Sequence, residues 1–133
     1  LEWKDMKNIE VKFPLIEDIK MDVAKKYGMI QPKSSDTKAV RAMFFIDPNG
    51  IIRCIHYYPL STGRNFDEMV RVIKALQKAD SDKVATPANW MPGDDTISPA
   101  PGTCAGAKER MEGKNKDMYC LDWFLCFNKE KKN

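Results

Sequence analysis

Two apolar runs separated by a short polar turn form the clearest pattern in the chain. Ala39–Asp47 and Ile51–Tyr58 are rich in β-branched and aromatic residues, and the sequence Asp-Pro-Asn-Gly at 47–50 joins them. Proline at the second turn position and glycine at the fourth favour a type I turn, so the pattern predicts a β-hairpin. The first run is apolar on both faces, which is typical of a central strand in a sheet covered on both sides.

A helical period follows the predicted hairpin. Asn65 is a favourable N-cap residue, and Glu68 occupies the capping-box position. The pattern predicts a helix from Asn65 to about Ala79. Its expected apolar face consists of Phe66, Met69, Val70, Ile73 and Leu76.

Weaker patterns indicate the remaining elements. Met21–Tyr27 has helical spacing and is followed by Gly28, a residue that favours the end of a helix. Phe13–Ile16 is a short apolar run, which predicts a brief buried strand. The other predicted elements are a helix end over residues 1–9, a short helix over 105–112 before Gly113, and an aromatic-rich terminal element over 120–127.

Residues 84–104 differ in character from the rest of the chain. Pro87, Pro92, Pro99 and Pro101 lie in this stretch and exclude a regular helix. A structureless stretch of about 20 residues is uncommon in a compact domain unless it serves binding. The stretch also contains Trp90, whose large apolar surface favours burial. We therefore expect an extended arm that wraps its own domain or a partner chain.

Length and charge narrow the class of protein. A chain of 133 residues with 43% hydrophobic and 31% charged residues corresponds to one ordinary domain. The net charge of +3 is too small to indicate nucleic-acid binding, and no apolar run is long enough to cross a membrane. Four cysteines are too few for a disulfide-built miniprotein, so we expect a reducing, cytoplasmic setting. Because the sequence begins with Leu1, we expect it to be a piece of something longer.

Two arginines are candidates for an anion site. Arg41 shares a predicted strand face with Met43 and Phe45, where a charged group needs an anionic partner unless it extends to solvent. Arg64 lies just before the predicted helix, where the helix dipole disfavours a cation. It either holds a carboxylate or another anion, or it is a solvated loop residue. Together the two arginines fit a thiolate, a phosphate or a carboxylate.

The cysteines give weaker signals. Cys120 and Cys126 are six residues apart, so they lie on different faces of a helix or about 20 Å apart in a strand. They cannot bond to one another without a turn, and we expect either sulfur to pair with a cysteine elsewhere. Cys54 and His56 share a strand face, which fits a Cys-His dyad but is more often a buried thiol beside a sheet histidine. No zinc, cofactor or nucleotide motif is present in the sequence.

Several segments together resemble one family. The sequences at 40–53, 57–68 and 84–95 resemble the later part of peroxiredoxins of the one-cysteine-like subfamily, and 120–126 resembles the two-cysteine tail of archaeal-type members. The resemblance implies an α/β, thioredoxin-like fold with an extended C-terminal arm. Residues 1–83 are then the C-terminal portion of the thioredoxin-like core, and residues 84–133 are the arm and dimerisation domain.

The resemblance also implies an activity and roles for single residues. Peroxiredoxins are thiol-dependent peroxidases that reduce hydrogen peroxide and alkyl hydroperoxides in antioxidant defence. Arg41 matches the arginine that contacts the peroxidatic thiolate and the peroxide, and Arg64 matches a second arginine that supports it. Cys126 matches the resolving position, and Cys120 a nearby accessory thiol. The implied partners are a peroxide, a thioredoxin-like or other thiol reductant, and copies of the chain in homodimers that often form decamers.

One departure from the family pattern is large. The peroxidatic cysteine belongs to a Pro-x-x-x-Thr-x-x-Cys motif, and none of the four cysteines lies in one. We therefore expect this segment and the first strands of the core to be missing, and the chain to be inactive alone. An alternative is a non-catalytic dimerisation or assembly module derived from a peroxiredoxin. A third possibility is an anion-binding domain, which the absence of a glycine-rich phosphate cradle argues against.

Overall fold

The computed structural model describes residues 10–33, 38–113 and 115–130. The chain forms two compact units, which are described separately. The first comprises Leu1–Met43 and Ile55–Gly63, and the second comprises Phe44–Cys54 and Arg64–Asn133. These units do not follow the predicted division at residue 83, which stays a prediction. None of the described helices is long and apolar enough to span a bilayer.

The first unit contains the short helix α1 (Asp22–Lys26). The Asp18 carboxylate accepts hydrogen bonds from the backbone N–H groups of Val23 (3.0 Å) and Ala24 (2.7 Å), which otherwise lack partners at the start of a helix. The helix ends at Lys26 with Tyr27 as its C-cap residue, and Gly28 follows in the left-handed conformation at φ +65°. The predicted helix and its terminal glycine are therefore confirmed.

The brief strand predicted over Phe13–Ile16 is wrong. No strand forms there, and the side chains of Phe13, Leu15 and Ile16 are 67–81% exposed. An apolar run becomes a buried strand only where a neighbouring strand pairs with it, and Pro14 also removes one backbone donor. The helix end predicted over residues 1–9 lies outside the described residues.

Strands β1 (Arg41–Ile46) and β2 (Ile52–Tyr58) form a β-hairpin. The Gly50 N–H donates to the Asp47 carbonyl oxygen (2.9 Å), and the Asp47 carboxylate accepts from the N–H groups of Asn49 and Ile51. Gly50 adopts φ +79°, which a side chain would disfavour. The hairpin prediction is confirmed.

The central position predicted for β1 is wrong within the described residues. There the sheet has two strands, and β2 is the neighbour of β1. Phe45 is buried, but Ile46 is 50% exposed. A strand with apolar residues on both faces becomes central only when further strands and covering layers are present.

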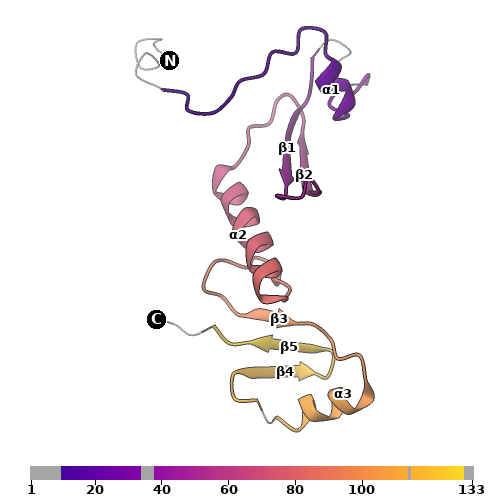
Figure 1. The fold of residues 1–133 in the computed structure, drawn as a ribbon, viewed down its shortest axis with the longest axis vertical. Coiled ribbons are helices and arrows are strands. Elements are labelled where there is room, and N and C mark those ends of the chain that lie inside the picture. Colours follow the sequence, from indigo (N-terminus) through magenta and orange to yellow (C-terminus); the bar gives the residue numbers. More distant parts are fainter. Residues whose placement is uncertain (1–9, 34–37, 114, 131–133) are drawn as a thin grey trace. The chain divides into compact units, whose positions relative to one another are not determined.

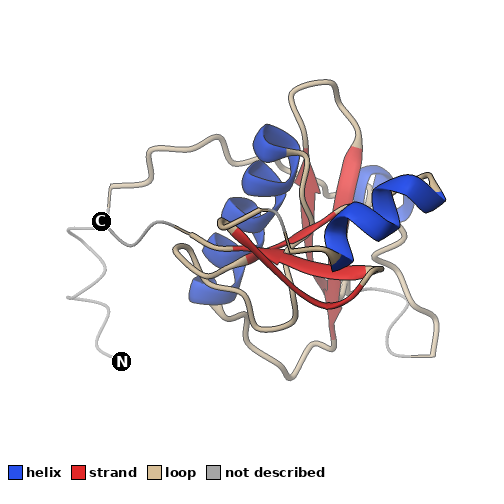
Figure 2. Cartoon of the chain, turned by 90° about the horizontal axis from the view of Figure 1, so that it is seen from below, coloured by secondary structure: helices blue, strands red, loops and turns tan. Residues whose placement is uncertain are grey.

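The second unit contains helix α2 (Phe66–Asp82), the longest of the described helices, which Figure 2 draws in blue. The Asn65 side chain caps it by accepting hydrogen bonds from the N–H groups of Asp67 (3.0 Å) and Glu68 (3.2 Å), as predicted. The predicted apolar face is only partly correct. Met69 and Val72 are buried, whereas three residues of the predicted face are exposed: Phe66 (71%), Val70 (50%) and Ile73 (44%).

The end of the second unit is a three-stranded antiparallel sheet. Its strands β3 (Thr96–Ser98), β4 (Met118–Asp122) and β5 (Leu125–Asn128) have the order β3-β5-β4, and helix α3 (Cys104–Met111) precedes β4 (Figure 1). The helix predicted over 105–112 is thus confirmed. The proline-rich arm contains no helix before α3, as predicted, and Trp90 within it is buried at 3% exposure.

Candidate functional site

A disulfide joins β4 and β5, the last two strands along the chain. The turn at Trp123 and Phe124 connects β4 to β5, and the register places Cys120 directly opposite Cys126. Their Cα atoms are 4.0 Å apart, and their Sγ atoms are bonded. The expectation that either sulfur pairs elsewhere is therefore wrong. The apolar residues of the turn concealed the hairpin, because they lack the glycine or asparagine that usually signals one.

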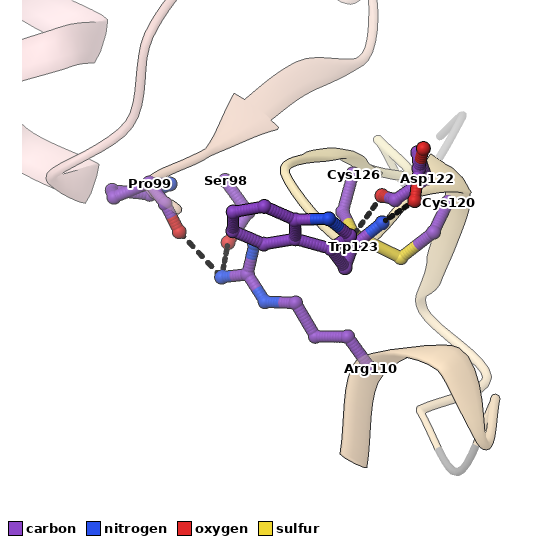
Figure 3. The surroundings of a disulfide bond; sticks show 7 residues. All are labelled: Ser98, Pro99, Arg110, Cys120, Asp122, Trp123 and Cys126. Atoms are coloured by element: carbon purple, nitrogen blue, oxygen red, sulfur yellow. Dashed lines mark hydrogen bonds between the residues drawn. A yellow bond between two sulfur atoms is a disulfide. The ribbon is translucent and has the colours of Figure 1, made fainter. Parts of the chain in front are cut away.

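The two bonded sulfurs have different surroundings (Figure 3). Cys126 lies on the central strand of the sheet and is 0% exposed, whereas Cys120 lies on the edge strand β4 and is only partly buried. On the other side of Cys126 the register places Ser98 of β3. The disulfide therefore has one enclosed sulfur and one sulfur at the edge of the sheet.

Arg110 fixes the strand segment next to Cys126. Its Nη2 group donates hydrogen bonds to the Ser98 Oγ atom (3.0 Å) and to the Pro99 carbonyl oxygen (Figure 3). Its Nη1 atom is buried and has no hydrogen-bond partner among the described residues. The sequence reasoning missed both Arg110 and Ser98. The sequence marks Arg110 only as a cation in the last turn of a helix, which is common, and it gives no sign of the role of Ser98.

A cavity of about 780 Å³ lies beside the edge strand. It is bounded by α3, the loop that follows α3 and strand β4. Its lining includes Cys120, Tyr119, Lys116, Arg110 and Glu109. Partial desolvation and the neighbouring Asp95 carboxylate raise the pKa of the Tyr119 phenol above its ordinary value of 10.0.

The two predicted active-site arginines belong to different units of the chain. Arg41 begins β1 in the first unit and is exposed, as in the alternative in which its side chain extends to solvent. Arg64 precedes the Asn65 cap in the second unit and is also exposed. Their joint action at an anion and their roles at a thiolate stay predictions.

The remaining cysteines are free thiols. Cys54 is partly buried in β2, and Cys104 is exposed at the start of α3. His56 lies beside Tyr58, whose hydroxyl is 3.4 Å from the His56 Nδ1 atom. Within the described ranges, no three His, Cys, Asp or Glu side chains gather in an arrangement that could hold a metal ion.

Ion pairs tie together the parts of the second unit. Arg53 of β2 donates two hydrogen bonds to the Asp80 carboxylate of α2 (2.6 and 2.9 Å), which lowers the pKa of Asp80 below its ordinary value of 3.8. Lys78 of α2 pairs with Asp82 and with Glu130, and both hydrogen bonds raise the pKa of Lys78. The segment after β5 is thereby held against α2.

Protein-family models and relatives of known sequence match most of the chain. Residues 2–55 match the model of the AhpC/TSA family, and residues 75–114 match that of the C-terminal domain of 1-Cys peroxiredoxin. A peroxiredoxin of Methanosarcina mazei is 59% identical over 130 residues, which cover 98% of this chain. The chain belongs to the peroxiredoxin family.

This peroxiredoxin chain spans 59% of the length of the Methanosarcina relative and 54% of peroxiredoxin 2 of Caldanaerobacter subterraneus, to which it is 51% identical. Two solved structures are similar. A yeast mitochondrial 1-Cys peroxiredoxin has a TM-score of 0.77 at 35% identity. The match covers 96% of this chain and 61% of the yeast protein. Peroxiredoxin 6 of Arenicola marina has a TM-score of 0.73 at 32% identity, and the match covers 98% of this chain and 62% of that protein. The α/β, thioredoxin-like fold implied by the sequence is thus confirmed.

Proposed function

We propose that this chain serves the thiol-dependent reduction of hydrogen peroxide and alkyl hydroperoxides, as the C-terminal part of a peroxidase. The observation that carries the proposal is the Cys120–Cys126 disulfide in a chain of this family. A cysteine pair that forms a disulfide can accept the oxidising equivalent that a peroxide delivers to another thiol. In this proposal the other thiol is the peroxidatic cysteine of the complete protein.

The proposed sequence of steps ends in the disulfide described above. The peroxidatic thiolate attacks the peroxide and becomes a sulfenic acid as the O–O bond breaks, and the leaving hydroxide or alkoxide takes a proton from solvent to give water or an alcohol. The Cys126 thiolate then attacks the sulfenic sulfur, forms a disulfide and releases hydroxide. The Cys120 thiolate attacks the Cys126 sulfur, which forms the Cys120–Cys126 bond and releases the peroxidatic thiolate. Cys126 is thus the resolving thiol, and Cys120 is the accessory thiol.

Arg41 and Arg64 are assigned to the peroxidatic step. A guanidinium beside a thiol lowers the thiol pKa and stabilises the charge that develops on the departing oxygen. Both side chains are exposed in this structure, so they are available to a segment that packs against them. Arg41 is assigned the direct contact with thiolate and peroxide, and Arg64 the support of that contact.

The proposed partners follow from the family. Peroxiredoxins use peroxides and thiol reductants and often form dimers or larger oligomers. For the yeast mitochondrial relative, thiol resolution proceeds via glutathione and thioredoxin systems, which supports a thiol reductant of either kind for this chain. Homodimers, their assembly into decamers and a cytoplasmic location complete the proposal.

Substitution of Arg41 in the complete protein tests the assigned role. Arg41→Ala is expected to lower the rate of thiol oxidation by peroxide by about 100-fold and to raise the thiol pKa, whereas Arg41→Lys retains part of the rate. Arg53→Ala is the matched control, because Arg53 is an arginine of the same hairpin that pairs with Asp80. Wild-type peroxide reactivity and thiol pKa in Arg41→Ala would show that the assigned role is wrong.

A second candidate function is a non-catalytic dimerisation or assembly module. The observation that favours it is the number of large apolar side chains left exposed, including Phe66, Val70 and Ile73 on one helix. Sedimentation discriminates between the candidates. A strictly monomeric chain with a protease-sensitive arm contradicts the assembly module.

A further inference from the structure

We propose that the Cys120–Cys126 disulfide is opened by a reductant thiolate at the Sγ atom of Cys120, from the cavity beside β4, and that Cys126 departs as the thiolate. Its biological role rests on the proposed function, in which this disulfide must be reduced after each turnover. The choice of sulfur rests on the geometry of the sheet and on the cavity beside it, not on the proposed function.

The direction of attack favours Cys120 over Cys126. In thiol–disulfide exchange the incoming thiolate approaches the attacked sulfur from the side opposite the sulfur that leaves. The register places Ser98, Cys126 and Cys120 in one row across β3, β5 and β4. Residues opposite one another in neighbouring antiparallel strands point to the same face of the sheet. The side behind Cys126 is therefore occupied by β3, whereas the side behind Cys120 is the open edge of the sheet.

A hydrogen-bonded strand segment fills the space behind Cys126. Ser98 is held in place there, because its hydroxyl accepts a hydrogen bond from Arg110, which also binds the Pro99 carbonyl oxygen. Figure 3 shows Ser98 and Pro99 on one side of Cys126 and Cys120 on the other. The 0% exposure of Cys126 agrees with this obstruction. A thiolate that attacks Cys126 must first displace part of a hydrogen-bonded strand.

The approach to Cys120 is open to a reductant. The cavity of about 780 Å³ beside β4 includes Cys120 in its lining and has room for a thiol side chain with its neighbouring groups. Lys116 and Arg110 also line it, against the single carboxylate of Glu109. The Arg110 guanidinium is bonded to Ser98 and Pro99, so Lys116 is the lining cation that can attract the negatively charged thiolate to Cys120.

The exchange is balanced in atoms and electrons. The reductant thiolate forms a bond to the Cys120 Sγ atom as the Cys120–Cys126 bond breaks, and the bonding pair stays on Cys126. A second reductant thiolate attacks the mixed disulfide, forms the reductant disulfide and releases the Cys120 thiolate. The protein disulfide gains two electrons, and two reductant thiols are oxidised. Cys126 is thereby returned to the form that its proposed resolving role requires.

The test locates the mixed disulfide formed with glutathione. The oxidised chain carries Cys54→Ser and Cys104→Ser, so that Cys120 and Cys126 are its only cysteines, and intact mass confirms that it starts as the disulfide. It reacts briefly with excess glutathione, acid stops the exchange, and free thiols are alkylated at low pH. Cleavage before Asp122 separates the two cysteines into different peptides for mass spectrometry.

At early times glutathione is expected on Cys120 and the alkyl group on Cys126, with an excess of about tenfold over the reverse pattern. Equal labelling, or glutathione mainly on Cys126, overturns the proposal. A second arm uses a thioredoxin whose second active-site cysteine is serine. Its crosslink is expected at Cys120, and a crosslink at Cys126 contradicts the proposal.

A variant tests the stated cause of the preference. Ser98→Gly removes the side chain behind Cys126 and is expected to raise the share of attack at Cys126 severalfold. Ser61→Gly, at an exposed turn position outside the sheet, is the matched control. An unchanged share in Ser98→Gly contradicts the argument from obstruction. Because no peroxide is used, these results can fail while the peroxidase function holds, and the loss of peroxidase activity leaves them unaffected.

Discussion

Trp90 shows how a single residue gives structure to an otherwise irregular arm. Its side chain is 3% exposed, its indole N–H donates to the Asp94 carbonyl oxygen (3.0 Å), and its own carbonyl accepts a hydrogen bond from Arg71 (3.2 Å). Trp90→Ala is expected to lower the free energy of unfolding of the second unit by about 3–5 kcal/mol. Urea titration followed by circular dichroism measures this change.

Two further tryptophan variants serve as controls. Trp90→Phe keeps most of the packing and loses one hydrogen bond, so about 1–2 kcal/mol is expected. Trp123 is 46% exposed, and Trp123→Phe is expected to change stability by no more than about 0.5 kcal/mol. Equal losses in the Trp90 and Trp123 variants would show that the arm is not packed as described.

Asp80 makes stability depend on pH. Its pKa is lowered from 3.8 by the hydrogen bonds and charge of Arg53, whereas in the unfolded chain it returns to the ordinary value. A carboxyl whose pKa is lower in the folded state stabilises the fold at pH values above the unfolded pKa. This contribution decreases as the pH falls below about 4 and is lost once the pH passes the folded pKa.

Asp80→Asn isolates that contribution. As the pH is lowered from neutral to below about 4, the urea concentration at the unfolding midpoint is expected to fall further for the wild-type chain than for Asp80→Asn. Both groups of the pair are exposed, so added salt is expected to reduce the difference. Parallel pH curves for the two proteins would mean that the Arg53–Asp80 pair does not stabilise the fold.

At the scale of an element, the start of α2 separates a structural residue from a proposed functional one. The Asn65 side chain accepts hydrogen bonds from two backbone N–H groups of the first turn. Asn65→Ala is therefore expected to destabilise the second unit by about 1 kcal/mol, and Asn65→Asp by much less. Thermal and urea unfolding measure both variants.

Arg64→Ala is the neighbouring control. Arg64 is exposed and lies at the helix end where a cation is disfavoured, so its removal is expected to leave stability within about 0.5 kcal/mol of the wild type. If Arg64→Ala destabilised as much as Asn65→Ala, Arg64 would have a structural role that its exposure does not indicate.

The elements also show what the sequence could predict. The hairpin turn at Asp47–Gly50, the Asn65 cap and the glycines after α1 and α3 each depend on residues next to one another, and all were predicted correctly. The disulfide depends on a turn made of Trp123 and Phe124, which carries no turn signal. Its two cysteines were identified as chemically important, but their pairing was not.

Burial could be predicted less well than local structure. Whether an apolar residue is covered depends on segments distant in the sequence, as Phe66 and Val72 of α2 show. The same holds for the candidate site. Ser98 and Arg110 matter because strand register and a helix bring them next to Cys126, and neither residue belongs to a motif. The roles of Arg41 and Arg64 came from family resemblance and stay predictions.

At the scale of the whole molecule, the described residues bury few large apolar side chains. The buried apolar set is Ala24, Val40, Phe45, Met69, Val72, Trp90 and Cys126. Many other large apolar side chains are about half exposed or more, among them Val70 and Ile73 on α2. Apolar surface left in water favours association with any chain that covers it.

We therefore expect the chain to self-associate, with a sedimentation coefficient that rises with protein concentration. The double substitution Val70→Lys and Ile73→Lys places charges on the exposed face of α2 and is expected to weaken association by about tenfold, which corresponds to about 1.4 kcal/mol. Gln77→Lys adds a charge to the same helix without removing apolar surface and is the matched control. Circular dichroism checks that the helix persists in each variant. Association unchanged by the double substitution would place the contact surface elsewhere, and a concentration-independent monomer would contradict the argument from exposed apolar surface altogether.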